Sequence, residues 1–249
     1  MRIALLFILL LLNEISLAQD ADANWDSYIA MYENELPGST TLNMDLHDRA
    51  PVAGLPNVVV TGLTYTNDRP DGLPVEGTLD TLYTLQEQLL SLMKTFGKYE
   101  HVGSFTHAGE RLEYFYLADS TGVFDALYTF YTQSYPNLER YINVKLDADW
   151  SYYREFLYPN EPTLAYMADL SVIRRLQEAG DPLTQPRRVD HWLHFTNSTD
   201  MKNCSKELKK LGFKVEKMME DGSGEWTHSL QIWGINQVDI GTSIHSIPS

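Results

Sequence analysis

Three carboxylates lie close together in the sequence, where they could act as the acid and base of a hydrolytic reaction. They are Asp147, Asp149 and Glu155, between a predicted strand and the segment that follows it. General acid–base catalysis needs one desolvated and one solvated carboxyl group across a cleft. At a connection from a strand to a helix, Asp is more often a helix cap. We therefore expect caps here, and an envelope hydrolase using carboxylates of the N-terminal domain is the alternative.

One acidic stretch matches the first ligand positions of a calcium-binding loop but lacks its later required residues. Residues 20–24 begin like an EF-hand loop, but Trp25 stands where that loop needs Gly and Met31 where it needs Glu. The chain also has no Gly-x-Ser-x-Gly elbow, no phosphate-binding Gly-rich loop with Lys, and no His-Glu-x-x-His motif. We predict no catalytic residue and no cofactor.

Four histidines occur in pairs, as metal ligands often do. His191 and His194 are three residues apart on a predicted strand, so their side chains point to opposite faces. His101 and His107 share a strand face, but they lie too far apart to bind one ion. We expect partly exposed sheet histidines and predict no metal site.

Aromatic residues form two groups that could bind a ligand. Tyr114 and Tyr116 share one strand face, but a sheet that stacks RNA bases also needs basic flanks. A second group is expected to pack under the sheet, because large aromatic side chains dominate cores. If part of it is exposed, a protein or glycan contact becomes the alternative. This group comprises Trp150, Tyr152, Tyr153, Phe156 and Tyr158.

Charge is distributed unevenly over the 249 residues, which hold 19 Lys and Arg against 34 Asp and Glu. From Gln19 to Pro186 there are 10 basic and 25 acidic residues, whereas residues 187–249 hold 8 of each. Such an acidic surface repels phosphate backbones, so we predict no nucleic-acid partner and favour a basic protein partner. The single cysteine, Cys204, excludes an internal disulfide and is expected to be a buried, inert thiol.

The N-terminus has the pattern of a secretory signal peptide. Met1-Arg2 precedes the apolar run 3–12, and Ser16-Leu17-Ala18 supplies small residues before Gln19. The run is too short for a stable transmembrane anchor. We predict a signal peptide over residues 1–18, cleavage near Ala18-Gln19, and an exported protein, periplasmic or secreted, with no membrane attachment afterwards. In a eukaryotic secretory route, Asn197-Ser198-Thr199 would be a glycosylation acceptor.

The first part of the mature chain alternates strand and helix patterns. From residue 57 the order is β-α-β-β-α-β, the split βαβ arrangement of ferredoxin-like folds, with two extra strands in front. Thr78 is the expected N-cap of the first helix and Gly97 its stop. The predicted strands are 25–32, 40–46, 57–65, 99–106, 111–117 and 140–146, and the predicted helices are 78–96 and 121–134.

The second part begins the same order after a helix and linker over 160–186, where Gly180, Pro182 and Pro186 interrupt the chain. Strand 189–195, helix 198–211 and strands 213–219 and 226–233 then make an incomplete β-α-β-β unit. The predicted fold class is α+β, with two tandem ferredoxin-like units of which the second is incomplete.

An incomplete sheet has an unpaired edge and a bare face near Leu230 and Ile232. Three arrangements could cover the edge or the face. The tail 235–247 could fold back as a strand, the helix from Pro162 to Ala179 could cover the face, or a second copy could pair edge to edge to form a homo-oligomer. We expect the helix, because its apolar stripe is adjacent in sequence.

Ordered short motifs in residues 24–159 resemble the domain of unknown function 695 family. They include Leu55-Pro56-Asn57, the run 69–73, Asp80-Thr81-Leu82-Tyr83, the run 149–153 and the closing run 156–159. This resemblance implies no known activity. Trp150, Tyr152 and Tyr153 are motif residues without an assigned role.

Residues 187–249 resemble the regulator of ribonuclease activity B family, through the run 186–192 and Leu211-Gly212-Phe213. The resemblance implies a ferredoxin-like module that binds ribonuclease E and modulates its cleavage without catalysis. Asp190, His191 and Trp192 are its motif residues, again without an assigned role. Ribonuclease E is cytoplasmic, so export implies another partner. We predict an exported, non-catalytic protein-binding or regulatory protein.

Overall fold

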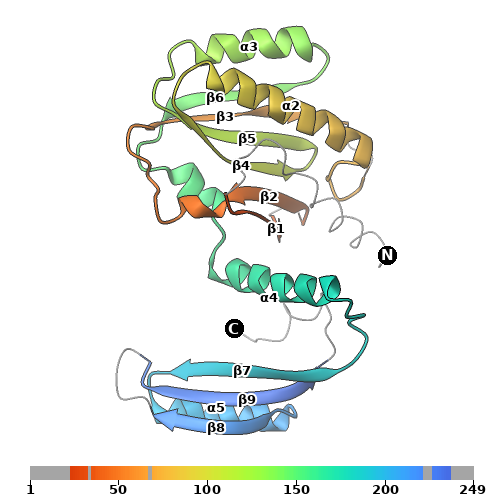
Figure 1. Cartoon of the computed structure of the whole chain (residues 1–249), viewed down its shortest axis with the longest axis vertical. Coiled ribbons are helices and arrows are strands. Elements are labelled where there is room, and N and C mark those ends of the chain that lie inside the picture. The colour runs from red at the N-terminus through yellow and green to blue at the C-terminus, as the bar shows by residue number, and fades with distance from the viewer. Residues whose placement is uncertain (1–22, 33–34, 67–68, 221–225, 237–249) are drawn as a thin grey trace. The chain divides into compact units, whose positions relative to one another are not determined.

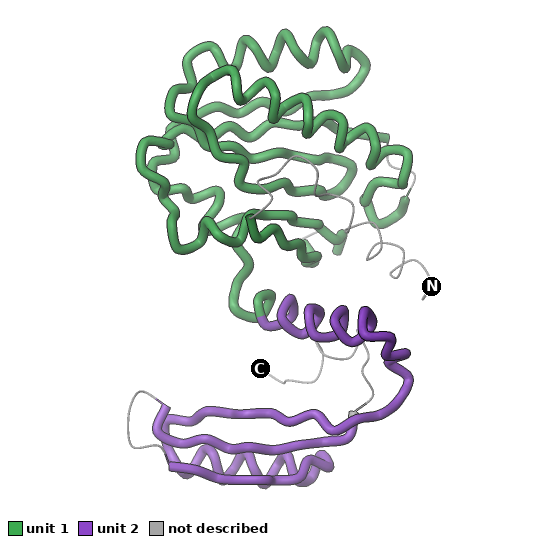
Figure 2. The backbone as a smooth tube through the Cα atoms, viewed as in Figure 1, with its two compact units in different colours: residues 1–164 green, residues 165–249 purple. Residues whose placement is uncertain are grey.

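The computed structural model describes residues 23–32, 35–66, 69–220 and 226–236, and the predicted signal peptide lies outside these residues. The chain divides into two compact units, residues 1–164 and 165–249 (Figure 2). Each unit has its own sheet, so the structure is of the α+β class, as predicted.

The first unit is built on a six-stranded antiparallel sheet with the order β1-β2-β4-β5-β3-β6 (Figure 1). The interior strands β5 and β3 are buried over most of their length, and β4 joins β5 through a tight hairpin. The strands are β1 (Trp25–Met31), β2 (Pro37–Asn43), β3 (Asn57–Thr64), β4 (Tyr99–His107), β5 (Glu110–Leu117) and β6 (Arg140–Leu146).

Two helices, α2 (Glu76–Lys94) and α3 (Val123–Ser134), cover one face of this sheet. Their apolar stripes meet the inward side chains of β3 and β5, which explains the three- and four-residue spacing of their leucines. The resulting core comprises Val59, Leu63, Leu85, Leu89, Met93, Phe115, Leu117, Val123, Leu127 and Tyr131.

The opposite face of the sheet is covered by a short π-helical segment, η3 (Tyr152–Leu157), and by the turn before it. Trp150 stacks on Tyr116 of β5, with ring centroids 4.0 Å apart. The Tyr153 hydroxyl donates to the carbonyl oxygen of Asn43 over 2.7 Å. These contacts hold residues 150–157 against the sheet of the first unit.

Two glycines permit close backbone geometry in this sheet. Ala108 and Gly109 both have positive φ, at 48° and 86°, as a two-residue hairpin between right-twisted strands requires. A Cβ on Gly62 would lie 1.9 Å from the Arg111 carbonyl oxygen. A side chain at residue 62 would therefore force β3 and β5 apart.

Some predicted boundaries were wrong because side chains compete for backbone groups. The predicted strand 40–46 is instead β2 followed by a 3-10 turn, η2 (Met44–Leu46), since the Asn43 side chain accepts from the Asp45 N–H. Helix α2 begins at Glu76, and its cap residue Val75 makes no side-chain bond. Thr78, the predicted cap, lies inside the first turn, where its N–H bonds the Val75 carbonyl.

The second unit contains a three-stranded antiparallel sheet with the order β7-β9-β8. Helix α5 (Ser198–Lys210) covers one face and is capped by Asn197, whose side chain accepts from the Asp200 N–H. Helix α4 (Glu161–Glu178) precedes the sheet and confirms the predicted helical pattern. The strands are β7 (Arg187–Phe195), β8 (Lys214–Glu220) and β9 (His228–Asn236).

The core of this sheet lies under α5. Leu230 and Ile232 are almost fully buried and cluster with Met201 of α5. Our expectation that these two residues lie on the bare face was wrong, because their alternation along β9 directs them toward α5. Among the described residues of this cluster, none comes from α4.

Candidate functional site

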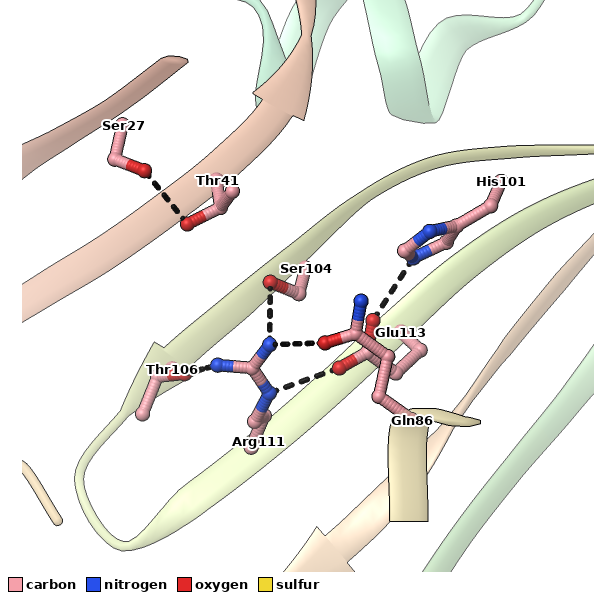
Figure 3. A network of polar contacts seen from close by, with 8 residues as sticks. All are labelled: Ser27, Thr41, Gln86, His101, Ser104, Thr106, Arg111 and Glu113. Carbon is pink, nitrogen blue, oxygen red and sulfur yellow. Dashed lines mark hydrogen bonds and ion pairs between the residues drawn. The ribbon is translucent and has the colours of Figure 1, made fainter. Parts of the chain in front are cut away.

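A network of buried polar side chains lies between α2 and the β4–β5 hairpin of the first unit (Figure 3). At its centre is Glu113, which is 1% exposed. One carboxylate oxygen accepts from Arg111 Nε over 2.8 Å, and the other lies 2.9 Å from His101 Nε2. The antiparallel register brings the three residues together, since His101 lies on β4 and the other two on β5.

Arg111 is held by hydroxyl and amide oxygens as well as by Glu113. Its Nη2 donates to Gln86 of α2 and to Ser104 Oγ, each over 3.0 Å. Its guanidinium also lies 5.6 Å from the centroid of the Tyr83 ring. A buried ion pair needs such additional partners to offset its desolvation. The arrangement therefore supports a structural network that ties α2 to the hairpin.

Burial alone would raise the pKa of Glu113, but the Arg111 charge and the hydrogen bond from His101 outweigh it and keep this pKa below its usual range. His101 packs between Trp25 and Phe115, with ring centroids 5.2 and 4.8 Å away. It is 7% exposed, so our expectation of a partly exposed sheet histidine was wrong at this position. Its second nitrogen, Nδ1, is buried without a hydrogen-bond partner.

The carboxylates singled out for acid–base chemistry do not form a buried pair. Asp147 accepts from the backbone N–H groups of Ser151 and Tyr152 and from the Tyr116 hydroxyl, so it caps the segment before η3. Asp149 and Glu155 are exposed. In the part of the chain that the structure describes, Glu113 is the one buried carboxylate, and it belongs to the ion-pair network.

The motif aromatics of the first unit divide between core and surface. Trp150 and Tyr153 are fully buried, and the Trp150 indole donates to the Leu55 carbonyl over 2.8 Å. Tyr152 is half-buried beneath Lys145, whose Nζ lies 4.6 Å from the ring centroid. Phe156 is 38% exposed. The prediction that this group packs against the sheet is confirmed for Trp150 and Tyr153.

The motif residues of the second unit alternate between the two faces of β7. His191 points to the α5 side, where its ring lies 5.7 Å from that of Phe213. Asp190 and Trp192 point to the other side, which we call the outer face. Trp192 is 58% exposed there. The outer face includes Arg188, Asp190, Trp192, His194, Lys214, Lys217, Met219, Ser229, Gln231, Trp233 and Ile235.

The charged side chains of the outer face pair with one another and with the ring of Trp233, which lies opposite Asp190. Arg188 donates to both carboxylate oxygens of Asp190 and to Glu216 of β8. Its guanidinium lies 4.6 Å from the centroid of Trp233, and Lys214 Nζ lies 4.9 Å from the same ring. Binding hot spots of protein interfaces are enriched in Trp and Arg, and this face contains both.

Two protein-family models match the chain, one in each part. Residues 23–158 match the family of unknown function DUF695. The chain belongs to the DUF695 family. Residues 167–239 match the regulator of ribonuclease activity B family, and the two families follow in the predicted order. No curated protein and no solved structure gives a significant match.

The buried network lies in the DUF695 segment, and the outer face lies in the segment that matches the regulator family. Within the described ranges, no three His, Cys, Asp or Glu side chains are placed to hold a metal ion. None of the helices described here is long and apolar enough to span a membrane.

Sequence reasoning missed the network around Glu113. The available signal was the strand 111–117, which begins with two charged residues, Arg111 and Glu113, on the same face as the apolar Phe115 and Leu117. A charge pair that shares a face with core residues indicates either burial or a strand that leaves the core. The pattern alone does not distinguish these cases.

Proposed function

We propose that this protein is a non-catalytic binding or regulatory protein that contacts another protein through the outer face of its second unit. The match to a regulator of ribonuclease activity supports a regulatory role. The observation that carries the proposal is Trp192, a motif residue with 58% of its surface exposed. It is the next residue along the outer face from Asp190, whose carboxylate pairs with Arg188. The acid excess of the first unit further supports a basic partner for that unit.

Replacing Trp192 with Ala should weaken partner capture at least tenfold, the effect of losing a hot-spot aromatic residue. The bait is the mature chain, applied to extract from the exported fraction and, separately, to purified ribonuclease E, with bound protein quantified by mass spectrometry. Trp226 is the matched control, because it is 54% exposed and lies before β9. Capture that is equal for wild type and Trp192→Ala would contradict the proposal.

We also propose that the chain is exported, supported by the positive start, short apolar run and small residues of positions 1–18. N-terminal sequencing of protein recovered from the exported fraction should begin at Gln19 or within a few residues of it. Soluble protein that retains Met1-Arg2 in the cytoplasm would contradict export and would favour ribonuclease E as the partner.

We further infer a ferredoxin-like core in each unit. In the first unit, β3-α2-β4-β5-α3-β6 follow one another in the chain, and their strands are ordered β6-β3-β5-β4 in the sheet. In the second, β7-α5-β8-β9 has the sheet order β7-β9-β8, which corresponds to the first three strands and first helix of the same pattern.

A further inference from the structure

The two edges of the second sheet differ in how they are protected against pairing with another strand. Exposed strand edges present unpaired N–H and C=O groups, and proteins block them with lysines, bulges or prolines. Edge strand β8 has two such features. Lys214 and Lys217 are exposed along it, and its pairing with β9 is irregular between Val215 and Lys217.

Edge strand β7 has neither feature. It pairs with β9 in unbroken register over nine residues, and it contains no Lys and no Pro. Its two arginines are engaged within the unit: Arg187 bonds both carboxylate oxygens of Asp181, and Arg188 bonds Asp190 and Glu216. Among the described residues, β9 is its one hydrogen-bonded neighbour.

We propose that β7 pairs antiparallel with β7 of a second copy of this chain, about a two-fold axis at Trp192. In this register Trp192 lies opposite its own copy. Each Asp190 lies opposite a His194 on the outer face, and each Val189 lies opposite a Phe195 on the α5 face. Directly opposed aromatic and apolar pairs stabilise a sheet, and an imidazole N–H can donate to an opposed carboxylate.

The neighbouring symmetric register is less complementary. An axis at His191 would place each Arg188 opposite a His194 and each Asp190 opposite a Trp192. It would thus lose both Asp190–His194 pairs and set His194 opposite Arg188, which is already bonded to Asp190 and Glu216. The alternation of β7 between its two faces requires that paired residues point to the same side, which excludes registers displaced by one residue.

The pairing would join the two three-stranded sheets into one continuous sheet with two Trp192 side chains at its centre. The pairing uses the backbone edge of β7, but its central side chain, Trp192, is also the residue proposed to contact a partner. The variants below change only His194, so they leave the Trp192 side chain intact.

Two substitutions of His194 test the register in the full mature chain. His194 is exposed, so both variants are expected to fold. His194→Asp places like charges at the two Asp190–residue 194 pairs and should weaken dimerisation about tenfold. His194→Lys introduces a positive charge opposite each Asp190 and should leave dimerisation equal or tighter. Analytical ultracentrifugation over a wide concentration range measures both.

Hydrogen exchange supplies a second measurement. Outward amide groups of β7 should exchange more slowly at high protein concentration than at low concentration, whereas those of β8 should not change. A wild-type chain that stays monomeric throughout would overturn the proposal. A dimer that His194→Asp leaves as tight as His194→Lys would also overturn it, as would protection of β8 in place of β7.

Discussion

Replacing Glu113 with Gln should lower the free energy of unfolding of the first unit by about 3–5 kcal/mol, because Arg111 would remain buried without its counter-charge. Hydrogen exchange of the β4 and β5 amides during urea titration reports this unit specifically. Exposed Glu87 on α2 provides the control, and Glu87→Gln should change the free energy by less than about 0.5 kcal/mol.

The same residue predicts a pH dependence. The pKa of Glu113 is lower in the folded chain than in the unfolded one, so the unfolded state binds more protons as the medium becomes acidic. Its stabilising contribution is therefore complete above the unfolded pKa and is lost as pH falls through the folded pKa. Glu113→Gln should flatten this acid limb of the stability curve. A variant with the wild-type slope and stability would show that the network does not stabilise the fold.

Replacing Trp150 with Ala should cost about 3–5 kcal/mol, the range for removing a large aromatic side chain from a core. Burial and two contacts support this figure: the ring is fully buried, it stacks on Tyr116, and its indole N–H donates to the Leu55 carbonyl. Trp150 also has a φ of 58°, a left-handed conformation that packing must maintain.

Trp192→Ala is the matched comparison for this prediction. Trp192 is largely exposed, so its removal should change stability by less than about 0.5 kcal/mol while it weakens partner capture. Thermal unfolding of both variants, followed by circular dichroism, separates the two roles. Equal losses of stability at the two positions would contradict the assignment of Trp150 to the core and Trp192 to a binding surface.

Most elements could be predicted because their signals are local. Leucines at helical spacing predicted α2, although the helix ends at Lys94, two residues before the predicted end. The predicted strands 99–106 and 111–117 agree with β4 and β5 to within one residue at each end, and the predicted start of α5 at Ser198 is correct. Errors occurred where a side chain bonded the backbone, as at Asn43, or where a helix began without a side-chain cap, as at Val75.

The sequence by itself determined the alternation of elements, the charge asymmetry and the motifs of two families, since each depends on residue types at short spacing. Tertiary structure alone decided which motif residues are buried. Trp150 and Trp192 have the same side chain, yet one stacks under β5 and the other is exposed on β7. Likewise, His101 meets Glu113 through the register of β4 and β5, because hydrogen bonding between strands brings together residues that lie apart in the chain.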